Sequence, residues 1–282
     1  MRILVTGAGG LLGAAISREF QPHADVHAFG RAQLDVSNDE AVAAAVGAAR
    51  PDVVINCAAY NNVDGAEQDP AAALRVNAFG VLALARSARE IGATLVHYST
   101  DFVFDGETTR PYTEEDRPNP RGLYAASKLL GDWFAADAPR AYVLRVESLF
   151  GDPGPGGARR GSLGTIVDRI RSGADVPVFV DRVVSPSYTV DIAAATRTII
   201  ERAIPAGLYH CVNTGAASWA QIAQEAARLL GVPLRMKELT LESASLTAPR
   251  PRYCALSTAK LAAVGVVMPP WQDALERYLS KL

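Results

Sequence analysis

Short apolar segments rich in β-branched residues alternate with longer amphipathic segments along the first half of the chain. The apolar segments predict strands at residues 2–6, 25–29, 52–56, 94–99 and 141–146. The amphipathic segments between them predict helices at residues 11–20, 39–49, 70–91 and 124–136. Strands that are apolar on both faces and alternate with helices are typical of a parallel sheet covered on each side. We therefore predict an α/β fold, a doubly wound parallel sheet of the Rossmann type.

A run of glycine and proline at residues 151–157 interrupts this alternation. Beyond it the pattern predicts helices at residues 163–172, 190–203, 219–230 and 271–279, and a short strand at residues 208–212. Gly/Pro clusters of this kind separate structural units. We predict a Rossmann domain over residues 1–150 and a smaller α/β lobe that binds substrate over residues 151–282, with parts of the chain crossing between the two.

Composition and charge exclude several classes of protein. The net charge of −2 argues against nucleic acid or an anionic membrane as the main partner. No segment approaches the roughly 18 uncharged apolar residues that a membrane span needs, so we expect a soluble cytoplasmic protein. The three cysteines form no Cys-x-x-Cys pair, and the four histidines show no ligand spacing. We expect buried reduced thiols and no metal at the catalytic centre.

Three glycines, Gly7, Gly10 and Gly13, directly follow the first predicted strand and open the first predicted helix. Glycine at these positions allows a tight turn, close approach of the backbone to a pyrophosphate, and close packing of helix on strand. The helix N-terminus then offers free N–H groups and a partial positive charge to phosphates. The loop therefore predicts a bound nicotinamide dinucleotide, the alternative being a glycine turn without a ligand.

The end of the second predicted strand indicates which dinucleotide is preferred. A fold that prefers NAD places an acid about 20 residues beyond the glycine loop, to bind the ribose hydroxyls. This chain has Gly30 and Arg31 there, which removes a repelling carboxylate and adds a guanidinium suited to phosphate. We predict NADPH, with NADH as the alternative cofactor and a solvated surface arginine as the alternative role. Asp35, followed by Val36, either accepts from the adenine amino group or caps the next helix.

A tyrosine and a lysine, Tyr124 and Lys128, are spaced to share one face of a helix. A lysine ammonium beside a phenol stabilises the phenolate, so we expect the Tyr124 pKa to be lowered toward neutrality. Such a tyrosine can give a proton to a carbonyl oxygen during reduction. Thr100 ends the fourth strand, at the sheet edge where ligands bind, and its hydroxyl could reach the same oxygen. The alternative for Thr100 is an ordinary threonine at a strand end.

The segments TGAGGLLG, HYSTDFVFDG and YAASKLLGD resemble the extended short-chain dehydrogenase/reductases. The segments NCAAYNNVDGAEQDP and GLYHCVNTGAASW, and the C-terminal segment that begins PRPRYCALSTAKL, are similar to the dTDP-4-dehydrorhamnose reductase family. These segments cover most of the chain in order. The resemblance implies a catalytic triad of Thr100, Tyr124 and Lys128, of which Tyr124 and Lys128 also contact the cofactor.

The resemblance also implies binding residues outside the triad. Backbone amides at Leu11 and Leu12 would meet the pyrophosphate. The segment lying along the cofactor after the third strand comprises Ala58, Ala59, Tyr60 and Asn61. Positions near the sugar comprise Val63, Thr100, Asp101 and Leu149. Leu149 stands where the family usually has a tryptophan packed on the hexose, so we expect a different sugar face.

The run Thr100-Asp101-Phe102 lacks the second acid that related sugar-nucleotide dehydratases use for elimination, which favours plain reduction. We expect NADPH-dependent reduction of the 4-keto group of a nucleotide-linked 4-keto-6-deoxy sugar, with dTDP-4-dehydrorhamnose as the leading substrate. The alternatives are a reductase of another deoxysugar nucleotide and a non-catalytic NADP-binding regulatory subunit. A homodimer is implied by the resemblance alone. Candidate contacts for the substrate diphosphate are Arg159, Arg160, Arg182, Arg250 and Arg252.

Overall fold

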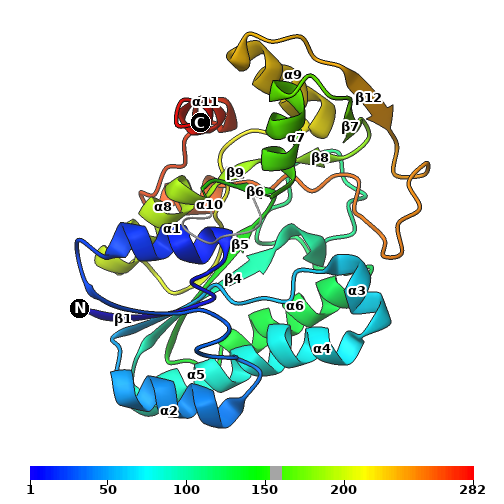
Figure 1. Ribbon diagram of the computed structural model, residues 1–282. Helices are drawn as coiled ribbons and strands as arrows, with labels where there is room; N and C mark the ends of the chain where they lie inside the picture. Colours follow the sequence, from blue (N-terminus) through cyan, green and yellow to red (C-terminus); the bar gives the residue numbers. More distant parts are fainter. Residues whose placement is uncertain (153–160) are drawn as a thin grey trace.

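The computed structural model describes residues 1–152 and 161–282, and its centre is a six-stranded parallel sheet (Figure 1). The strand order is β10-β5-β4-β3-β1-β2. The strands are β1 (Arg2–Thr6), β2 (Asp25–Phe29), β3 (Val53–Asn56), β4 (Thr94–Thr100), β5 (Arg140–Val146) and β10 (Gly207–His210). The predicted doubly wound α/β fold is therefore confirmed, and the five strands of the first half agree with their predicted ends to within one residue.

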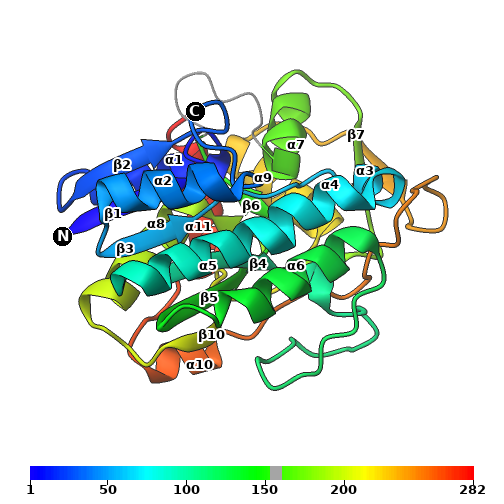
Figure 2. The same cartoon turned by 90° about the horizontal axis from the view of Figure 1, so that it is seen from below.

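Helices cover both faces of this sheet. One face carries α1 (Leu11–Phe20) and α8 (Thr189–Glu201), which pack on each other. The other face carries α2 (Asp39–Ala49), α5 (Gly80–Ile91) and α6 (Leu123–Ala135), which lie side by side in Figure 2. Alternate side chains of each strand point to opposite faces. In β1, for example, Ile3 and Val5 join the core under α1, whereas Leu4 joins the core under α2 and α5.

The long helix predicted over residues 70–91 is interrupted in the structure. It consists of α4 (Pro70–Leu74), a π-helical turn η1 (Arg75–Phe79) and α5. The side chain of Asp69 caps the start by accepting from the Ala72 amide at 2.9 Å. The prediction of one regular α-helix is wrong at its centre, where the wide turn buries the side chain of Asn77. Turns of this kind are frequent at functional sites.

A smaller lobe lies over one edge of the sheet (Figure 1). Its helices are α7 (Gly161–Arg171), α9 (Trp219–Leu230) and α11 (Trp271–Leu279). Short strand pairs connect them: β7 (Val176–Phe179) with β12 (Met236–Leu239), β8 (Val183–Val184) with β11 (Ala217–Ser218), and β6 (Leu149–Phe150) with β9 (Ser187–Tyr188). The lobe has its own apolar core, which includes Val167, Ile222 and Leu275.

The chain beyond residue 150 also returns to the sheet. Strand β10 pairs with β5, α8 packs on α1, and α10 (Ala259–Ala263) contacts β10. The remaining short elements are α3 (Val63–Gln68), between β3 and α4, and η2 (Asp101–Val103), directly after β4. Among the described residues, no helix combines the length and apolar character needed to cross a membrane.

The topology explains where a ligand would bind. Helix α1 follows β1 on one face of the sheet, whereas α2 follows β2 on the other face and leads to β3, beside β1. The carboxyl ends of β1 and β3 therefore flank the point where the winding changes direction. Ligands of doubly wound sheets bind at that point.

Candidate active site

The glycine loop connects β1 to α1 at this switch point. Gly7 has φ of +66°, and its carbonyl accepts from the Gly10 amide at 2.9 Å. A Cβ on Gly13 would collide with the Gly7 backbone, so this tight turn requires glycine at both positions. Gly10, the N-cap of α1, has no side chain to bind the first amides of the helix. Those amides are thus free for phosphate oxygens.

A cleft of about 390 Å³ opens beside this loop. Its lining includes Gly10, Leu11, Leu12 and Gly13, which are the predicted pyrophosphate contacts. A second cavity of about 360 Å³ adjoins it and is lined by the predicted adenosine residues Arg31, Asp35 and Val36, and by Gly7 and Tyr60. The two cavities share five lining residues: Gly10, Cys57, Ala58, Ala59 and Asn61. Together they form one extended groove, and its shape and phosphate-binding turn fit a dinucleotide.

At the predicted adenosine end of the groove, the described residues include an exposed cation, Arg31, and an anion, Asp35. The Arg31 side chain is 88% exposed, and its Nε lies 3.9 Å from Asp35 Oδ2. Hydrogen bonds from the Ser37 hydroxyl and amide lower the pKa of Asp35, which is therefore ionised at neutral pH. The side chain of Asn38, not that of Asp35, caps α2 by accepting from the Ala41 amide.

The segment after β3 is held in place by Asn77 from the π-helical turn. The Asn77 side chain accepts from the Tyr60 amide at 2.8 Å and donates to the Tyr60 carbonyl at 3.1 Å. It also donates to the hydroxyl of Ser127, on α6, at 3.0 Å. One buried amide therefore fixes the cofactor segment relative to the helix that carries Tyr124 and Lys128. Our sequence analysis missed Asn77, whose only signal is a buried polar residue inside an apolar helical pattern.

The three predicted catalytic residues meet in the same cleft. Thr100 ends β4, Tyr124 lies in the first turn of α6, and Lys128 lies one turn further along. A hydrogen bond joins the side chains of Thr100 and Tyr124. The Thr100 hydroxyl also donates to Asp101 Oδ1 at 3.0 Å. The edge of the Phe102 ring packs on Tyr124, with ring centroids 5.6 Å apart.

The pKa of Tyr124 differs from the value that we expected beside Lys128. Burial raises the pKa of Tyr124, and the hydrogen bond with Thr100 offsets only part of that effect. Burial also lowers the pKa of Lys128 to about 8, and its ammonium donates to the Tyr98 carbonyl at 2.6 Å. The predicted lowering of the Tyr124 pKa by Lys128 is wrong for this structure, because burial has the largest effect on that pKa and Lys128 is not among the groups that shift it. Tyr124 is therefore a protonated phenol, the form that can donate a proton.

The far end of the cleft contains the residues assigned to the sugar. Val63, Asp101 and Leu149 all line it, beside Glu147 and Ser148. Ser148 has φ of +46°, which turns the chain sharply between β5 and β6. Leu149 presents an aliphatic side chain to the cleft and packs against the core under α1.

A buried ionisable cluster underlies the sugar end, and our sequence analysis did not find it. Oxygen atoms of Asp101 and Glu147 and the sulfur of Cys254 lie within 4.8 Å of one another. Arg182 Nη2 lies 3.8 Å from Asp101 Oδ2, and Glu147 Oε1 accepts from the Ser185 amide at 2.7 Å. Burial, together with the nearby Asp101, raises the pKa of Glu147 well above its usual range. The sequence did contain one signal for this cluster, because the acidic Glu147 directly follows the apolar strand β5.

The raised pKa of Glu147 predicts a specific dependence of stability on pH. A carboxyl with a raised pKa in the folded state stabilises the fold below its unfolded-state pKa, and this contribution is lost as pH rises through the folded-state pKa. Glu147→Gln removes the titration, so we expect the variant to gain at least about 1 kcal/mol of unfolding free energy relative to the parent between pH 5 and pH 9. Urea denaturation at both pH values measures this difference.

The exposed Glu90, on α5, offers the control for that measurement. Glu90→Gln should change the unfolding free energy equally at the two pH values. A Glu147→Gln difference that is also independent of pH would contradict the assignment of a buried, proton-bearing carboxyl.

The structure describes three of the five arginines named as candidate contacts for a diphosphate. Arg182 pairs with Asp101 and stacks over the Phe102 ring, and Arg250 donates to Asp64 Oδ2 at 2.8 Å. Arg252 is exposed on a loop. None of these three is among the described residues that line the cleft. Arg159 and Arg160 lie outside the described residues.

Burial governs the ionisation of the three cysteines and of two histidines. The thiols of Cys57, Cys211 and Cys254 are free, and burial raises the pKa of each. His97 and His210 are fully buried, and burial keeps their pKa values below the usual range, that of His210 at about 3. These two histidines are therefore neutral at physiological pH.

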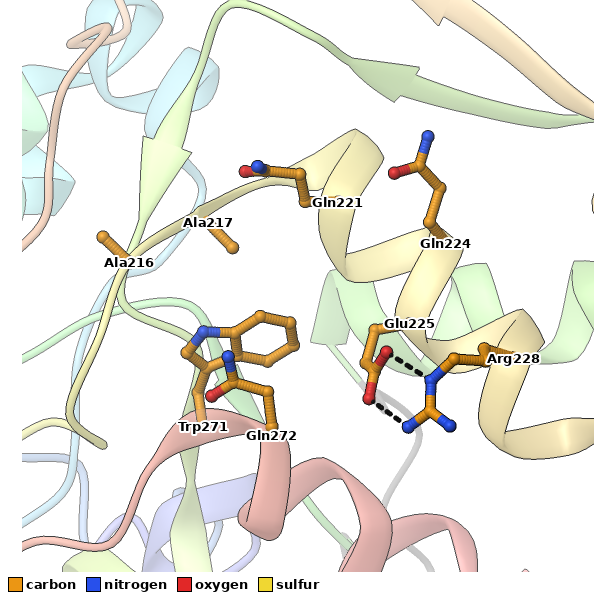
Figure 3. Close-up of a pocket in the computed structure, with 8 residues that line it drawn as sticks. All are labelled: Ala216, Ala217, Gln221, Gln224, Glu225, Arg228, Trp271 and Gln272. Carbon is orange, nitrogen blue, oxygen red and sulfur yellow. Dashed lines mark hydrogen bonds and ion pairs between the residues drawn. The ribbon is translucent and has the colours of Figure 1, made fainter.

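A separate hollow of about 370 Å³ lies between α9 and α11, away from the cleft (Figure 3). The Trp271 ring forms one wall, and Gln221 and Gln224 project from α9. Glu225 and Arg228 join in a two-point ion pair at 2.6 and 2.8 Å. No described residue lines both this hollow and the cleft.

Comparison with known proteins identifies the family. The family model for the RmlD substrate binding domain matches residues 1–282. The chain is 38% identical to dTDP-4-dehydrorhamnose reductase of Streptomyces griseus, over 97% of this chain and 91% of the relative. The chain belongs to the dTDP-4-dehydrorhamnose reductase family.

Two further proteins that are similar to this chain help to interpret the site. The crystal structure of dTDP-4-dehydrorhamnose reductase from Bacillus anthracis in complex with NADP superposes with a TM-score of 0.94 and 30% identity, covering 100% of this chain and 99% of that one. A probable dTDP-4,6-dihydroxy-2-methyloxan-3-one 4-ketoreductase of Streptomyces antibioticus is 37% identical, over 98% of this chain and 93% of the relative.

Proposed function

We propose that the protein reduces the 4-keto group of dTDP-4-dehydrorhamnose with NADPH, giving dTDP-L-rhamnose. The observation that carries this proposal is the convergence of Thr100, Tyr124 and Lys128 on a cleft continuous with the glycine loop. The named activity of the Streptomyces griseus relative supports the substrate. The NADP in the Bacillus anthracis structure supports the cofactor.

The glycine loop and the start of α1 would hold the pyrophosphate, and Arg31 would face the 2′-phosphate at the adenosine end. NADPH, when bound, supplies the hydride that adds to C4 of the sugar. Tyr124 then donates its phenolic proton to O4 as negative charge develops there. Thr100, hydrogen-bonded to Tyr124, binds the same oxygen. Lys128 would bind the ribose hydroxyls on the nicotinamide side. The low exposure of all three side chains excludes water from the proton transfer.

A direct assay tests the proposed function. Purified protein, NADPH and dTDP-4-dehydrorhamnose should show loss of absorbance at the NADPH band, with dTDP-L-rhamnose identified by mass spectrometry and NMR. Absence of turnover, with cofactor binding shown separately by calorimetry, would exclude this substrate. Absence of turnover with every keto sugar nucleotide tested would favour the regulatory role.

A second candidate is the reduction of another deoxysugar nucleotide. The Streptomyces antibioticus relative carries the name of a ketoreductase for a different sugar at a similar level of identity. The aliphatic Leu149 and the small Ser148 at the sugar end would suit a less polar hexose face. A panel of 4-keto sugar nucleotides ranked by kcat/KM distinguishes the two candidates, because the natural substrate should exceed the others by at least tenfold.

Arg31 provides a test of cofactor preference. We expect Arg31→Ala to weaken NADPH binding about tenfold and to leave NADH binding nearly unchanged, because only NADPH carries the 2′-phosphate. Isothermal titration calorimetry with both cofactors measures the effect. Arg117→Ala, at an exposed arginine outside the groove, is the control. Equal losses for the two cofactors would show that Arg31 does not select between them.

The division of labour between the two parts of the chain also remains a proposal. The separate core around α7, α9 and α11 supports a substrate-binding lobe within residues 151–282. Strand β10 and helix α8, although they lie beyond residue 150, would serve the Rossmann domain. The homodimer implied by the resemblance stays a prediction, which light scattering would test.

A further inference from the structure

Helix α6 carries an aspartate, Asp132, one turn beyond Lys128 and on the same face. Both side chains are withdrawn from solvent, with 2% of Lys128 and 8% of Asp132 exposed. A buried ammonium is costly unless an anion lies near it. Asp132 has no place in the proton transfer proposed above, yet it is the acidic residue nearest to Lys128 along this helix face.

Asp132 is held from the two strands beneath α6. Arg145, on β5, donates to Asp132 Oδ2 from Nη2 at 3.3 Å and from Nε at 3.4 Å. From β4, His97 Nε2 lies 3.9 Å from Asp132 Oδ1. Burial raises the pKa of Asp132, and the nearby Arg145 offsets part of that effect. Asp132 Oδ1 and Arg145 Nη1 have no hydrogen-bond partner among the described residues. The Asp132 carboxylate is therefore influenced by two buried cations, Arg145 and Lys128, and its Oδ1 atom still lacks a hydrogen bond.

Among the described residues, no other anion is placed to replace Asp132 beside Lys128. From β4 and the segment after β3, His97 and Cys57 face Lys128, and burial keeps both neutral. Tyr124, on α6 itself, is a protonated phenol. Behind Arg145 lie the neutral imidazole of His210, on β10, and the carboxylate of Glu114, on the loop after β4.

We propose that Asp132 is a positioning residue that keeps the Lys128 ammonium charged inside the cleft, and that Arg145 limits this effect by competing for the same carboxylate. Burial and Asp132 act on the Lys128 pKa in opposite directions and leave it at about 8. Lys128 is thus a cation at neutral pH but loses its charge not far above it. The inference concerns the charge of Lys128 itself and goes beyond the choice of substrate.

The chain offers a direct measurement, because it has only four lysines. Lys237, Lys260 and Lys281 are exposed, and Lys128 alone is buried. Protein labelled with ¹³C at the lysine Cε positions should therefore show one NMR resonance that titrates near pH 8. Lys128→Met assigns this resonance by removing it. The measurement requires neither cofactor nor substrate.

Two variants should shift this titration in opposite directions. Asp132→Asn removes the anion, so the Lys128 midpoint should fall by about one pH unit. Arg145→Gln removes the competing cation, so the midpoint should rise, and this variant keeps the experiment decisive if Asp132→Asn fails to fold. Asp191→Asn breaks a more exposed ion pair, between α8 and Arg277 on α11, and should leave the midpoint unchanged.

The outcomes separate a charge effect from a packing effect. A role in packing alone would lower the melting temperature of Asp132→Asn without moving the Lys128 midpoint, and that result would overturn the proposal. An Arg145→Gln midpoint that stays in place or falls would also overturn it. Failure of the reductase assay would leave the NMR titration unaffected, so the two proposals fail independently.

Discussion

Tyr124→Phe is expected to lower kcat by about 100-fold or more while leaving NADPH affinity within about twofold of the parent. The phenol is the proposed proton donor in the cleft. It is protonated because burial raises its pKa, and phenylalanine keeps the ring that packs against Phe102. Since the hydroxyl acts as charge develops on O4, its loss should appear in kcat rather than in KM. Steady-state kinetics with the keto sugar nucleotide and fluorescence titration with NADPH measure the two quantities.

Tyr142 provides a matched control for this substitution. It is a buried tyrosine on β5, and its hydroxyl donates to the Ile204 carbonyl at 2.7 Å instead of lining the cleft. Tyr142→Phe should lose some stability but keep nearly full turnover. If Tyr124→Phe kept turnover equally well, another group would have to supply the proton, and the proposed mechanism would be wrong.

Gly13→Ala is expected to disable the cofactor loop. The added Cβ would collide with the backbone of Gly7, which cannot move freely because it is packed against Cys57 and Ala58. Overpacking of a tight backbone contact typically costs about 1–3 kcal/mol. If the loop opens to relieve the clash, NADPH affinity falls by about 5- to 150-fold. Calorimetric titration and thermal unfolding together report how the cost divides between binding and stability.

Gly9 lies in the same loop and provides the control substitution for Gly13→Ala. A Cβ at this position meets no atom within 4 Å, and its φ is not in the left-handed region. Gly9→Ala should therefore leave stability and NADPH affinity close to those of the parent. Equal damage from the two substitutions would mean that chain flexibility, not the close approach of Gly13 to Gly7, makes the loop sensitive.

Local patterns were sufficient to predict much of the fold and the presence of Tyr124 and Lys128 in one cleft. The strands of the first half, the glycine loop and the Tyr124–Lys128 pair all depend on spacing within a few residues, and the structure places them as expected. The strand near residue 208 was also predicted, but its pairing with β5 was not. That pairing joins segments more than 60 residues apart in sequence, and no local pattern records it.

The features that escaped prediction depend on burial or on contacts between distant segments. The sequence places Lys128 four residues from Tyr124, but it does not show how completely the fold removes both from water. This burial reversed the expected direction of the Tyr124 pKa shift. The cluster of Asp101, Glu147 and Cys254 likewise assembles from three separate parts of the chain. Two-residue strands such as β6 and β9 are too short for any periodicity.

The π-helical turn at residues 75–79 sets the rotational phase of the helix that contains it. An α-helix advances about 100° per residue, so removing one residue from this turn to restore regular α geometry would rotate everything before it by about that angle relative to α5. Asn77 would then swing away from Tyr60 and Ser127, which it now holds together. The segment after β3 and helix α6 are therefore positioned relative to each other by the same residue, Asn77. A change in length at this turn would move them out of register with each other, even if every residue that lines the cleft were left intact.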